Sequence, residues 1–306
     1  MKALISGITG FIGSHVAELL LDNGENVIGV SHSTWLSTAP AKLKENVSLV
    51  SWDITKPADK SVLSTIRRFD PDVVFHFAGI SIPYLCGRES PTEQALSVNV
   101  TGTNHVLDLA CQLPEPRFIF ASTCHVYDRV TRNAPVVSED APIQPGSAYG
   151  QTKLQSEREI LRRVSASELN ACIVRGFHHI GPRQPNGLML TDWLGQVRDP
   201  QSRMIEVRCD NSYLDLIDVR DAARGYSLVA QKGDPGGIYN MGSGKITKSG
   251  DVLGAILELV PREFQVKVGS TEEQWNPIAD ISKLQSLGWS PTTNYETTIR
   301  DMLSAD

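Results

Sequence analysis

The amino-acid sequence predicts an α/β protein, a doubly wound parallel sheet with a smaller C-terminal lobe. Short apolar runs rich in Val, Ile and Phe recur through the first 176 residues. They are continuous rather than alternating, as parallel strands buried on both faces should be. Helical patterns lie between most of them. Strand alternating with helix is typical of a parallel sheet that is covered by helices on both sides.

The strands and helices are expected in the following order. Strands are predicted at residues 2–7, 26–32, 47–54, 72–79, 117–123 and 170–176. Helices are predicted at residues 11–24, 61–69, 94–112 and 147–164, and Gly24 is a stop signal for the first of them. After about residue 176 the alternation loosens, and residues 181–187 and 233–237 are rich in glycine and proline. We therefore expect a main domain over residues 1–176, to which residues 214–235 return, and a smaller lobe over residues 177–213 and 236–306.

Composition narrows the class of protein. The chain has 306 residues, of which 41% are hydrophobic and 21% charged, as in soluble globular proteins. Its net charge is −6 and its basic residues are scattered singly, which argues against a nucleic-acid or membrane partner. The five cysteines lack metal-site spacing, so we expect no metal and reduced thiols in the cytoplasm. We expect neither a signal peptide nor a membrane span.

Three glycines mark the turn between the first strand and the first helix. Gly7, Gly10 and Gly13 stand in the sequence SGITGFIGSH. This spacing lets the backbone turn tightly and approach a pyrophosphate, which then lies at the helix N-terminus. A glycine triplet alone is a weak signal, but here the strand, turn and helix are all expected. The main domain is therefore predicted to be a Rossmann-type domain that binds a dinucleotide.

The end of the second strand bears on which dinucleotide is bound. A carboxylate there hydrogen-bonds the ribose of NAD, and its absence leaves room for a 2′-phosphate. The chain has Ser31, His32 and Ser33 at this place, with neither an acid nor an arginine. The sequence therefore favours NADP over NAD. Asp53, after the third strand, is placed to receive the adenine amine, or else it caps a helix that begins near Lys56.

Tyr149 and Lys153 stand four residues apart in AYGQTK, on one face of a predicted helix. An ammonium near a phenol lowers the phenol's pKa, because it favours the phenolate. The phenol can then exchange a proton with a sugar hydroxyl or ketone while a nicotinamide exchanges the hydride. Because the pair lies downstream of a glycine turn and of Thr123, it is a stronger signal than its spacing alone.

Together these motifs resemble the extended short-chain dehydrogenase/reductases, the family of NAD-dependent nucleotide-sugar epimerases and dehydratases. The matching residues are GITGFIG (7–13), Asp53, HFAG (76–79), Asn99, FASTCHVYD (120–128), Tyr149, Lys153, VRGFHHIGP (174–182), LIDVRDAARGY (216–226), YNMGSG (239–244) and DISKLQSLGWSP (280–291). Within the family, the segments HHIGPRQ, VRCDN and DVRD most resemble GDP-4-keto-6-deoxymannose reductases. Many relatives pair through a two-helix face, so the resemblance also implies a homodimer.

The resemblance implies three groups of site residues. The catalytic residues are Thr123, Tyr149 and Lys153. The dinucleotide contacts are Gly7, Gly10, Phe11, Ile12, Gly13, Ser31, His32, Ser33, Asp53, Ile54, Phe77, Ala78, Gly79, Asn99, Ala121, Tyr149, Lys153, Gly176, Phe177 and His179. The substrate contacts, made by the smaller lobe and the wall of the site, are Ser81, Thr123, Cys124, His125, His178, Arg183 and Arg208.

The stretch STCHVYD (122–128) has three possible interpretations. Cys124 and His125 could be a cysteine–histidine nucleophile, half of a metal site, or part of the wall of another active site. Neighbouring side chains on a strand point to opposite faces, so Cys124 and His125 should not face each other, whereas Thr123 and His125 share a face. The family's 4,6-dehydratases carry Asp-Glu where this chain has Cys124 and His125, and a thiol cannot match that acid pair. We expect a wall in which Cys124 is a small buried hydrophobe and His125 contacts the substrate or carries a proton.

Three positions that hold the diphosphate of a sugar nucleotide in the family differ here. The expected Asn is His178, one expected Arg is Leu214, and the other is Ser270 or a neighbour. Losing two guanidiniums removes charge-assisted, bidentate phosphate contacts. Either other arginines substitute for them, or the substrate is not an ordinary nucleoside diphosphate sugar. The candidates for substitution are Arg183, Arg203 and Arg208.

The leading expectation is an NAD(P)-dependent oxidoreductase that acts on a small-molecule nucleotide sugar. We expect it to reduce a 4-keto group by hydride transfer, with Tyr149 as the proton donor. The alternatives are a 4-epimerase, or an atypical dehydratase, that recycles a bound NAD. A different class, a non-catalytic dinucleotide-binding sensor or scaffold, is opposed by the set of Thr123, Tyr149 and Lys153.

Overall fold

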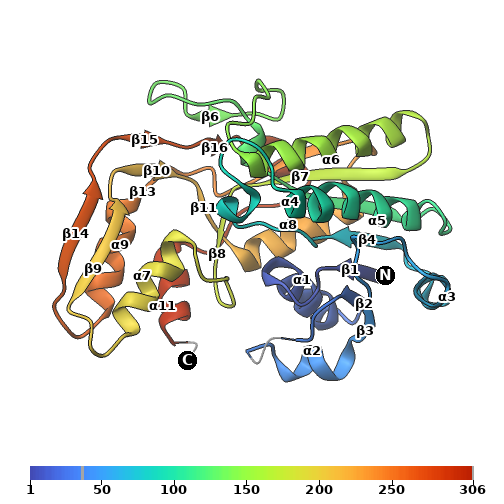
Figure 1. Cartoon of the computed structure of the whole chain (residues 1–306), viewed down its shortest axis with the longest axis horizontal. Coiled ribbons are helices and arrows are strands. Elements are labelled where there is room, and N and C mark those ends of the chain that lie inside the picture. Colours follow the sequence, from blue (N-terminus) through green and yellow to red (C-terminus); the bar gives the residue numbers. More distant parts are fainter. Residues whose placement is uncertain (36–37, 305–306) are drawn as a thin grey trace.

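A parallel sheet forms the larger part of the molecule. The computed structural model describes residues 1–35 and 38–304 (Figure 1). Seven strands pair in the order β12-β7-β5-β4-β1-β2-β3, all of them parallel. They are β1 (Lys2–Ser6), β2 (Asn26–Ser31), β3 (Ser48–Ser51), β4 (Val73–His76), β5 (Arg117–Thr123), β7 (Asn170–Gly176) and β12 (Ile238–Met241). The predicted doubly wound class is confirmed.

Helices cover both faces of this sheet. Alternate residues of one strand point to opposite faces, and each face has its own apolar core. On β5, Ile119 belongs to one core, and Phe118 and Phe120 belong to the other. The first core packs under α1 (Phe11–Asp22) and α8 (Val219–Lys232). The second packs under α3 (Lys60–Phe69), α5 (Thr103–Ala110) and α6 (Ala148–Ser165).

The helix predicted over residues 94–112 is interrupted. It consists of α4 (Glu93–Leu96), a π-helical segment (Ser97–Gly102) and α5. A Cβ atom at Gly102 would lie 2.9 Å from the side chain of Ile54, so the glycine lets this segment pack closely on the loop after β3. Single-turn π segments within helices often occur at functional sites, because they redirect side chains. Here the segment carries Asn99 into the interior.

A smaller lobe follows the sheet in the chain and has its own apolar core, which includes Leu190, Trp193, Ile205 and Ile256. Figure 1 shows this lobe beside the sheet, with β9 and β14 at its outer edge. Its elements are α7 (Met189–Arg198), β9 (Met204–Cys209), β10 (Ser212–Leu214), β13 (Thr247–Lys248), α9 (Ser249–Leu259), β14 (Gln265–Ser270), β15 (Gln274–Trp275) and α11 (Tyr295–Ser304).

The remaining elements are short. They are α2 (Ala41–Asn46), two 3-10 helices (Pro83–Cys86 and Cys124–Val126), β6 (Val136–Val137), β8 (His178–Ile180), β11 (Leu216–Asp218), β16 (Ile278–Ala279) and α10 (Ser282–Ser286). β8 pairs with β11, and β6 pairs with β16. Among the described residues, no helix combines the length and apolarity needed to cross a membrane.

The structure changes two of the domain boundaries that were drawn from the sequence. Residues 236–306 were assigned to the lobe, but β12 pairs with β7 as the edge strand of the main sheet. Leu284 and Trp289 also pack into the core beneath α1 and α8. Conversely, Leu214, expected to return to the main domain, packs into the core of the lobe. The assignment of the lobe to substrate binding stays a prediction.

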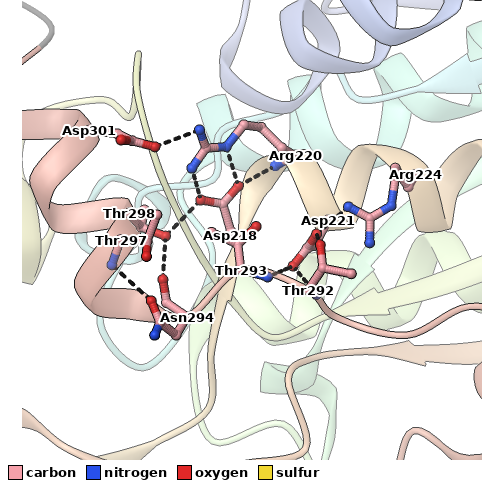
Figure 2. Close-up of polar contacts among 10 residues, drawn as sticks. All are labelled: Asp218, Arg220, Asp221, Arg224, Thr292, Thr293, Asn294, Thr297, Thr298 and Asp301. Carbon is pink, nitrogen blue, oxygen red and sulfur yellow. Dashed lines mark hydrogen bonds and ion pairs between the residues drawn. The ribbon is translucent and has the colours of Figure 1, made fainter.

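Two buried carboxylates at the start of α8 tie the C-terminal segment to the rest of the chain (Figure 2). Asp218 accepts hydrogen bonds from Arg220 and from the hydroxyl of Thr298 on α11, the latter at 2.7 Å. Arg220 also donates to Asp301 at 2.7 Å. Asp221 accepts from two backbone N–H groups of the segment before α11. Because both carboxylates are fully hydrogen-bonded, their burial is compensated.

A buried ion pair fixes α6 on the sheet. Arg175 on β7 and Glu157 on α6 are 3% and 1% exposed. Two guanidinium nitrogens donate to the two carboxylate oxygens, at 3.1 and 2.9 Å. The hydroxyl of Ser122 on β5 donates to the same carboxylate, and Arg175 also donates to the hydroxyl of Tyr127 at 3.1 Å. The pair therefore joins α6 to two adjacent strands.

Replacing Glu157 with alanine should destabilise the protein strongly, because it leaves the Arg175 guanidinium buried without its counter-charge. Breaking a buried pair from one side costs roughly 3–5 kcal/mol. Urea unfolding followed by circular dichroism would measure this loss. The matched control is Glu159→Ala on the same helix, which should cost little, because Glu159 pairs with the exposed Arg162 and with Arg163, and Arg163 keeps its second ion pair with Asp108. Equal losses in both variants would contradict the role given to the buried pair.

Candidate active site

The site begins where β5 ends and α6 starts. Ser147 caps α6, since its hydroxyl accepts a hydrogen bond from the N–H of Gly150 at 3.1 Å. A Cβ atom at Gly150 would lie 2.2 Å from the carbonyl oxygen of His125, so only glycine permits this approach. The first turn of α6 therefore rests against the residues that follow β5. This contact sets Tyr149 beside Thr123.

Thr123, Tyr149 and Lys153, predicted as catalytic, are brought together. All three are buried, with 4%, 8% and 5% of their surfaces exposed. The hydroxyl of Thr123 lies close enough to the phenol of Tyr149 to affect the phenol's pKa. The Lys153 ammonium donates to the carbonyl oxygen of Ala121 at 2.8 Å and lies 4.7 Å from the centre of the Phe120 ring. The side chains of Tyr149 and Lys153, both on α6, therefore lie at the end of β5.

Burial controls the protonation of this group. Burial raises the pKa of Tyr149, and the nearby thiols of Cys86 and Cys124 act in the same direction. The Thr123 hydroxyl opposes them and lowers the pKa. The sequence led us to expect a pKa lowered by Lys153, and the structure corrects this, because desolvation dominates. Burial also lowers the pKa of Lys153 to about 8, so its ammonium is the main form only below that pH.

Asn99 holds the loop after β4 next to Lys153. Its side-chain oxygen accepts from the N–H of Ile80 at 2.7 Å, and its amide donates to the Ile80 carbonyl and to Thr152, both at 3.1 Å. Gly79 lies against this amide, since a Cβ atom there would be 3.1 Å from its oxygen and 3.6 Å from the Lys153 nitrogen. The predicted residues Phe77, Ala78 and Gly79 form this loop. It therefore borders the same space as the lysine.

The predicted glycine turn has the required geometry. Gly7 adopts a positive φ of 71°, and a Cβ atom there would lie 2.5 Å from the backbone nitrogen of Ala78. A Cβ atom at Gly13 would lie 2.4 Å from the carbonyl oxygen of Gly7. Gly10 begins α1 without any side-chain cap. The N–H groups of Phe11 and Ile12 belong to this uncapped first turn, which is the arrangement that receives a phosphate.

An open groove of about 420 Å³ lies beside the end of β3. Three predicted residues, His32, Asp53 and Ile54, line it together with Thr55, Glu93, Gln94, Ser97 and Val98. Asp53 accepts hydrogen bonds from the N–H and hydroxyl of Thr55, so it forms a tight turn. The alternative of a helix cap is wrong for Asp53, because the next helix, α3, starts at Lys60 and is capped by Asp59.

The serines at the end of β2 form a small hydroxyl cluster beside the glycine turn. The hydroxyl of Ser31 lies 2.8 Å from that of Thr9 and 3.3 Å from that of Ser33. His32 and Ser33 are exposed. Hydroxyls can donate to a phosphate, and an imidazole adds positive charge when protonated. Among the residues that the structure describes, β2 itself ends without an acidic side chain, but the carboxylate of Asp53, just after the neighbouring strand β3, interacts with His32.

The residues after β7 form another side of the site. A Cβ atom at Gly176 would lie 2.5 Å from the ring of His179, so the ring rests on the glycine. One ring nitrogen of His179 lies 2.7 Å from the carbonyl oxygen of Phe177, and the ring stacks on Tyr226 at 6.2 Å. Tyr226 was not predicted as a site residue. It lies on α8, and only tertiary packing brings it close enough to Tyr149 for the two phenols to interact electrostatically.

Cys124, His125 and His178 converge, contrary to the prediction that Cys124 and His125 point apart. β5 ends at Thr123, and residues 124–126 form a turn of 3-10 helix, in which strand alternation no longer applies. One possible ligand atom from each of the three residues lies within 4.8 Å of the other two. The ring of His125 meets those of Tyr149 and His178 edge to face, at 5.8 and 6.0 Å.

The two arginines predicted to contact the substrate lie elsewhere. Arg183 donates to Glu18 and Ser14 on α1, at 2.7 and 3.2 Å, so its charge is already neutralised by an ion pair. Arg208 is exposed on β9, which Figure 1 places at the outer edge of the lobe, far from α6. Arg203 donates to backbone carbonyls of its own loop. Ser81 is exposed in the loop before the 3-10 helix Pro83–Cys86.

The chain resembles known proteins over its whole length. The model of the NAD dependent epimerase/dehydratase family matches residues 3–242. Low-salt glycan biosynthesis protein Agl12 of Haloferax volcanii is 26% identical over 97% of this chain and 95% of the relative. GDP-6-deoxy-D-mannose reductase of Pseudomonas aeruginosa is 23% identical over 99% and 96% of the two chains. The solved UDP-glucuronic acid 4-epimerase of Bacillus cereus, in complex with UDP-glucuronic acid and NAD, superposes with a TM-score of 0.85 at 25% identity, covering 100% and 98%.

Binding of a dinucleotide should weaken as the pH rises through about 8. The pKa of Lys153 lies below its usual value, so its ammonium is present at pH 7 and largely lost at about pH 9. Titration of NADPH at several pH values, followed by fluorescence, would measure the change. Lys153→Met should bind weakly at every pH, whereas the matched control Lys60→Met, on the surface of α3, should keep the profile. A flat profile in the unmodified protein would contradict this assignment.

Proposed function

The chain belongs to the NAD-dependent epimerase/dehydratase family, and from that premise we propose that it reduces the 4-keto group of a nucleotide-linked sugar with NADPH. It is an NAD(P)-dependent enzyme of the extended short-chain dehydrogenase/reductase type. One observation carries the proposal. Thr123, Tyr149 and Lys153 are buried together at the end of β5, where burial raises the pKa of the Tyr149 phenol, so the phenol keeps its proton. This is the form that the reduction of a ketone needs.

In the proposed reaction, the nicotinamide supplies the hydride. Tyr149 donates its phenolic proton to the carbonyl oxygen, which becomes the hydroxyl of the product. Thr123 keeps the reacting oxygen beside that phenol through its own hydroxyl. Lys153 stabilises the phenolate left behind, because its ammonium is the main form at neutral pH. The buried site excludes water, which strengthens each of these interactions.

The same residues argue against a dehydratase of the ordinary kind. Elimination needs an acid and a carboxylate near the sugar, and this chain offers Cys124 and His125 at those positions. Burial raises the pKa of Cys124 to about 12 and lowers that of His125, so both side chains are neutral near pH 7. The second candidate is a 4-epimerase. It is favoured by the similarity to the UDP-glucuronic acid 4-epimerase, whose solved structure holds NAD.

We assign the dinucleotide as follows. The uncapped first turn of α1, with Gly7 and Gly10, receives the pyrophosphate. Asp53 and the groove at the end of β3 receive the adenine. The Ser31 hydroxyl cluster receives a 2′-phosphate, which favours NADP. The nicotinamide lies between Lys153 and the residues that follow β4 and β7, which include Gly79, Asn99, Gly176 and His179.

The substrate that fits this proposal is a nucleotide-linked 4-keto-6-deoxy sugar. The motif resemblance and the similarity to GDP-6-deoxy-D-mannose reductase both favour it. The lobe would hold the nucleotide part, and relatives of this family suggest a homodimer. The diphosphate must be held without the guanidinium that Leu214 replaces, since that side chain packs into the core of the lobe.

Tyr149→Phe should abolish turnover while leaving the fold and NADPH binding intact. Removal of the proton donor should lower kcat on the order of a hundredfold or more. The assay is the oxidation of NADPH in the presence of a GDP-linked 4-keto-6-deoxy sugar, with one NADPH consumed per sugar reduced. Tyr295→Phe in the lobe is the matched control and should keep normal turnover. Near-normal activity in Tyr149→Phe would remove the mechanism. Dinucleotide that survives desalting, with no net NADPH oxidation, would favour the epimerase.

The protein should bind NADP more tightly than NAD, by about tenfold, which corresponds to 1.4 kcal/mol. Ser31→Asp should reverse the preference, because a carboxylate repels the 2′-phosphate and accepts both ribose hydroxyls. Titration of both dinucleotides against both proteins measures the ratio. Ser64→Asp on the surface of α3 adds the same charge away from the site and should leave the ratio unchanged. A clear preference of the unmodified protein for NAD would contradict the assignment and favour the epimerase.

A further inference from the structure

Three side chains beside the proposed catalytic pair are the kinds that bind transition metals. Cys124 and His125 come from the 3-10 turn after β5, and His178 comes from β8. One sulfur or nitrogen atom of each lies within 4.8 Å of the other two. The thiol is buried and both imidazoles are half-buried. A thiolate with two imidazoles is a donor set that suits zinc and its neighbours in the periodic table.

Both imidazoles are available as neutral ligands. The ordinary pKa of an imidazole is about 6.5, so histidine is mostly uncharged near neutral pH. At neutral pH each ring therefore keeps a lone pair on one nitrogen. The Nδ1 atom of His178 is buried and has no hydrogen-bond partner among the described residues. A buried polar atom without a partner is costly, so a ligand at this atom would relieve that cost.

We propose that Cys124, His125 and His178 form a binding site for one divalent cation of the zinc class. Zinc binds nitrogen at roughly 2.0–2.1 Å and thiolate sulfur at roughly 2.3 Å, which places tetrahedral ligands roughly 3.3–3.8 Å apart. The present separations of up to 4.8 Å are wider by about 1 Å. Binding of the ion therefore requires the three side chains to move together by about 1 Å.

The thiol must lose its proton when the ion binds. An ordinary cysteine has a pKa of about 8.5, so the free site holds a thiol near neutral pH. A divalent cation reverses this balance, because its charge favours the thiolate. As the metal–sulfur bond forms, the S–H bond breaks and the proton passes to solvent. One proton is therefore released for each ion bound.

The proposed metal site lies beside the residues that are assigned to catalysis. The ring of His125 touches that of Tyr149, so the ion would lie beside the phenol and the Thr123 hydroxyl. Three protein ligands leave a fourth position for water or for an oxygen of the substrate. The competing account is that the same three side chains contact the sugar directly and bind no ion. Metal binding can be measured without any sugar, so its outcome is separate from that of the proposed reduction.

The test is a titration of the chelator-treated, full-length protein with Co²⁺, followed by absorbance. The expected result is one ion per chain, a thiolate-to-cobalt charge-transfer band, release of one proton per ion, and displacement by Zn²⁺. Cys124→Ser should lose the band, and His178→Asn and His125→Gln should each weaken binding about a hundredfold or more. Absence of the charge-transfer band in the unmodified protein would overturn the proposal.

The matched control is Cys111→Ser, which removes an exposed thiol elsewhere on the molecule. It should leave the stoichiometry, the band and the affinity unchanged. Loss of the band in Cys111→Ser together with its retention in Cys124→Ser would place the ion at the surface and overturn the proposal. NADPH binding without metal verifies that each variant is folded, because the dinucleotide residues are separate from the three ligands.

Discussion

The buried pair of Arg175 and Glu157 is the interaction on which the active site depends. Glu157 lies four residues after Lys153 and eight after Tyr149, so the three side chains share one face of α6. When Arg175 holds the carboxylate against β7, it turns the lysine and the phenol toward the end of β5. Two charges in the interior are tolerated because every nearby donor and acceptor is used, including Ser122 and the hydroxyl of Tyr127. The Arg175–Glu157 pair thus positions Tyr149 and Lys153, although it takes no part in the proposed reaction.

Burial shifts the pKa values of the ionisable groups in the active site. It favours the uncharged form of each ionisable group, so it raises the pKa values of Tyr149 and Cys124 and lowers those of Lys153 and His178. The phenol therefore starts as a proton donor rather than as a base. The imidazoles are ligands or hydrogen-bonding groups rather than cations.

Buried acidic side chains, together with apolar packing, attach the lobe to the sheet. Asp218 and Asp221 begin α8, which packs on the sheet, and both are hydrogen-bonded to the segment around α11 (Figure 2). A carboxylate at a helix start also interacts favourably with the helix dipole. The same acids therefore serve α8 itself and its attachment to the lobe. This places the lobe, with Leu214 in its core, beside the carboxyl ends of the strands.

The sequence by itself determined the elements and the local motifs. The strands at residues 117–123 and 170–176 agree with β5 and β7, and Gly7 and Gly13 make the close contacts that their spacing implied. These features depend on neighbours in the chain, through backbone conformation and apolar periodicity. The pairing of Tyr149 with Lys153 also follows from helix geometry alone. Local patterns are therefore sufficient for the fold class and for the centre of the site.

Only the tertiary structure decided what these elements meet. The strand β5 stops at Thr123, and the turn that follows brings Cys124 to His178, which lies far along the chain. Arg183 is held by Glu18 of α1, and β12 joins the sheet from a region with no strand signal strong enough to place it. The pKa of Tyr149 is set by desolvation, which depends on everything packed around it. Contacts between distant segments and the burial they produce leave no local pattern in the sequence, so they appear only once the chain is folded.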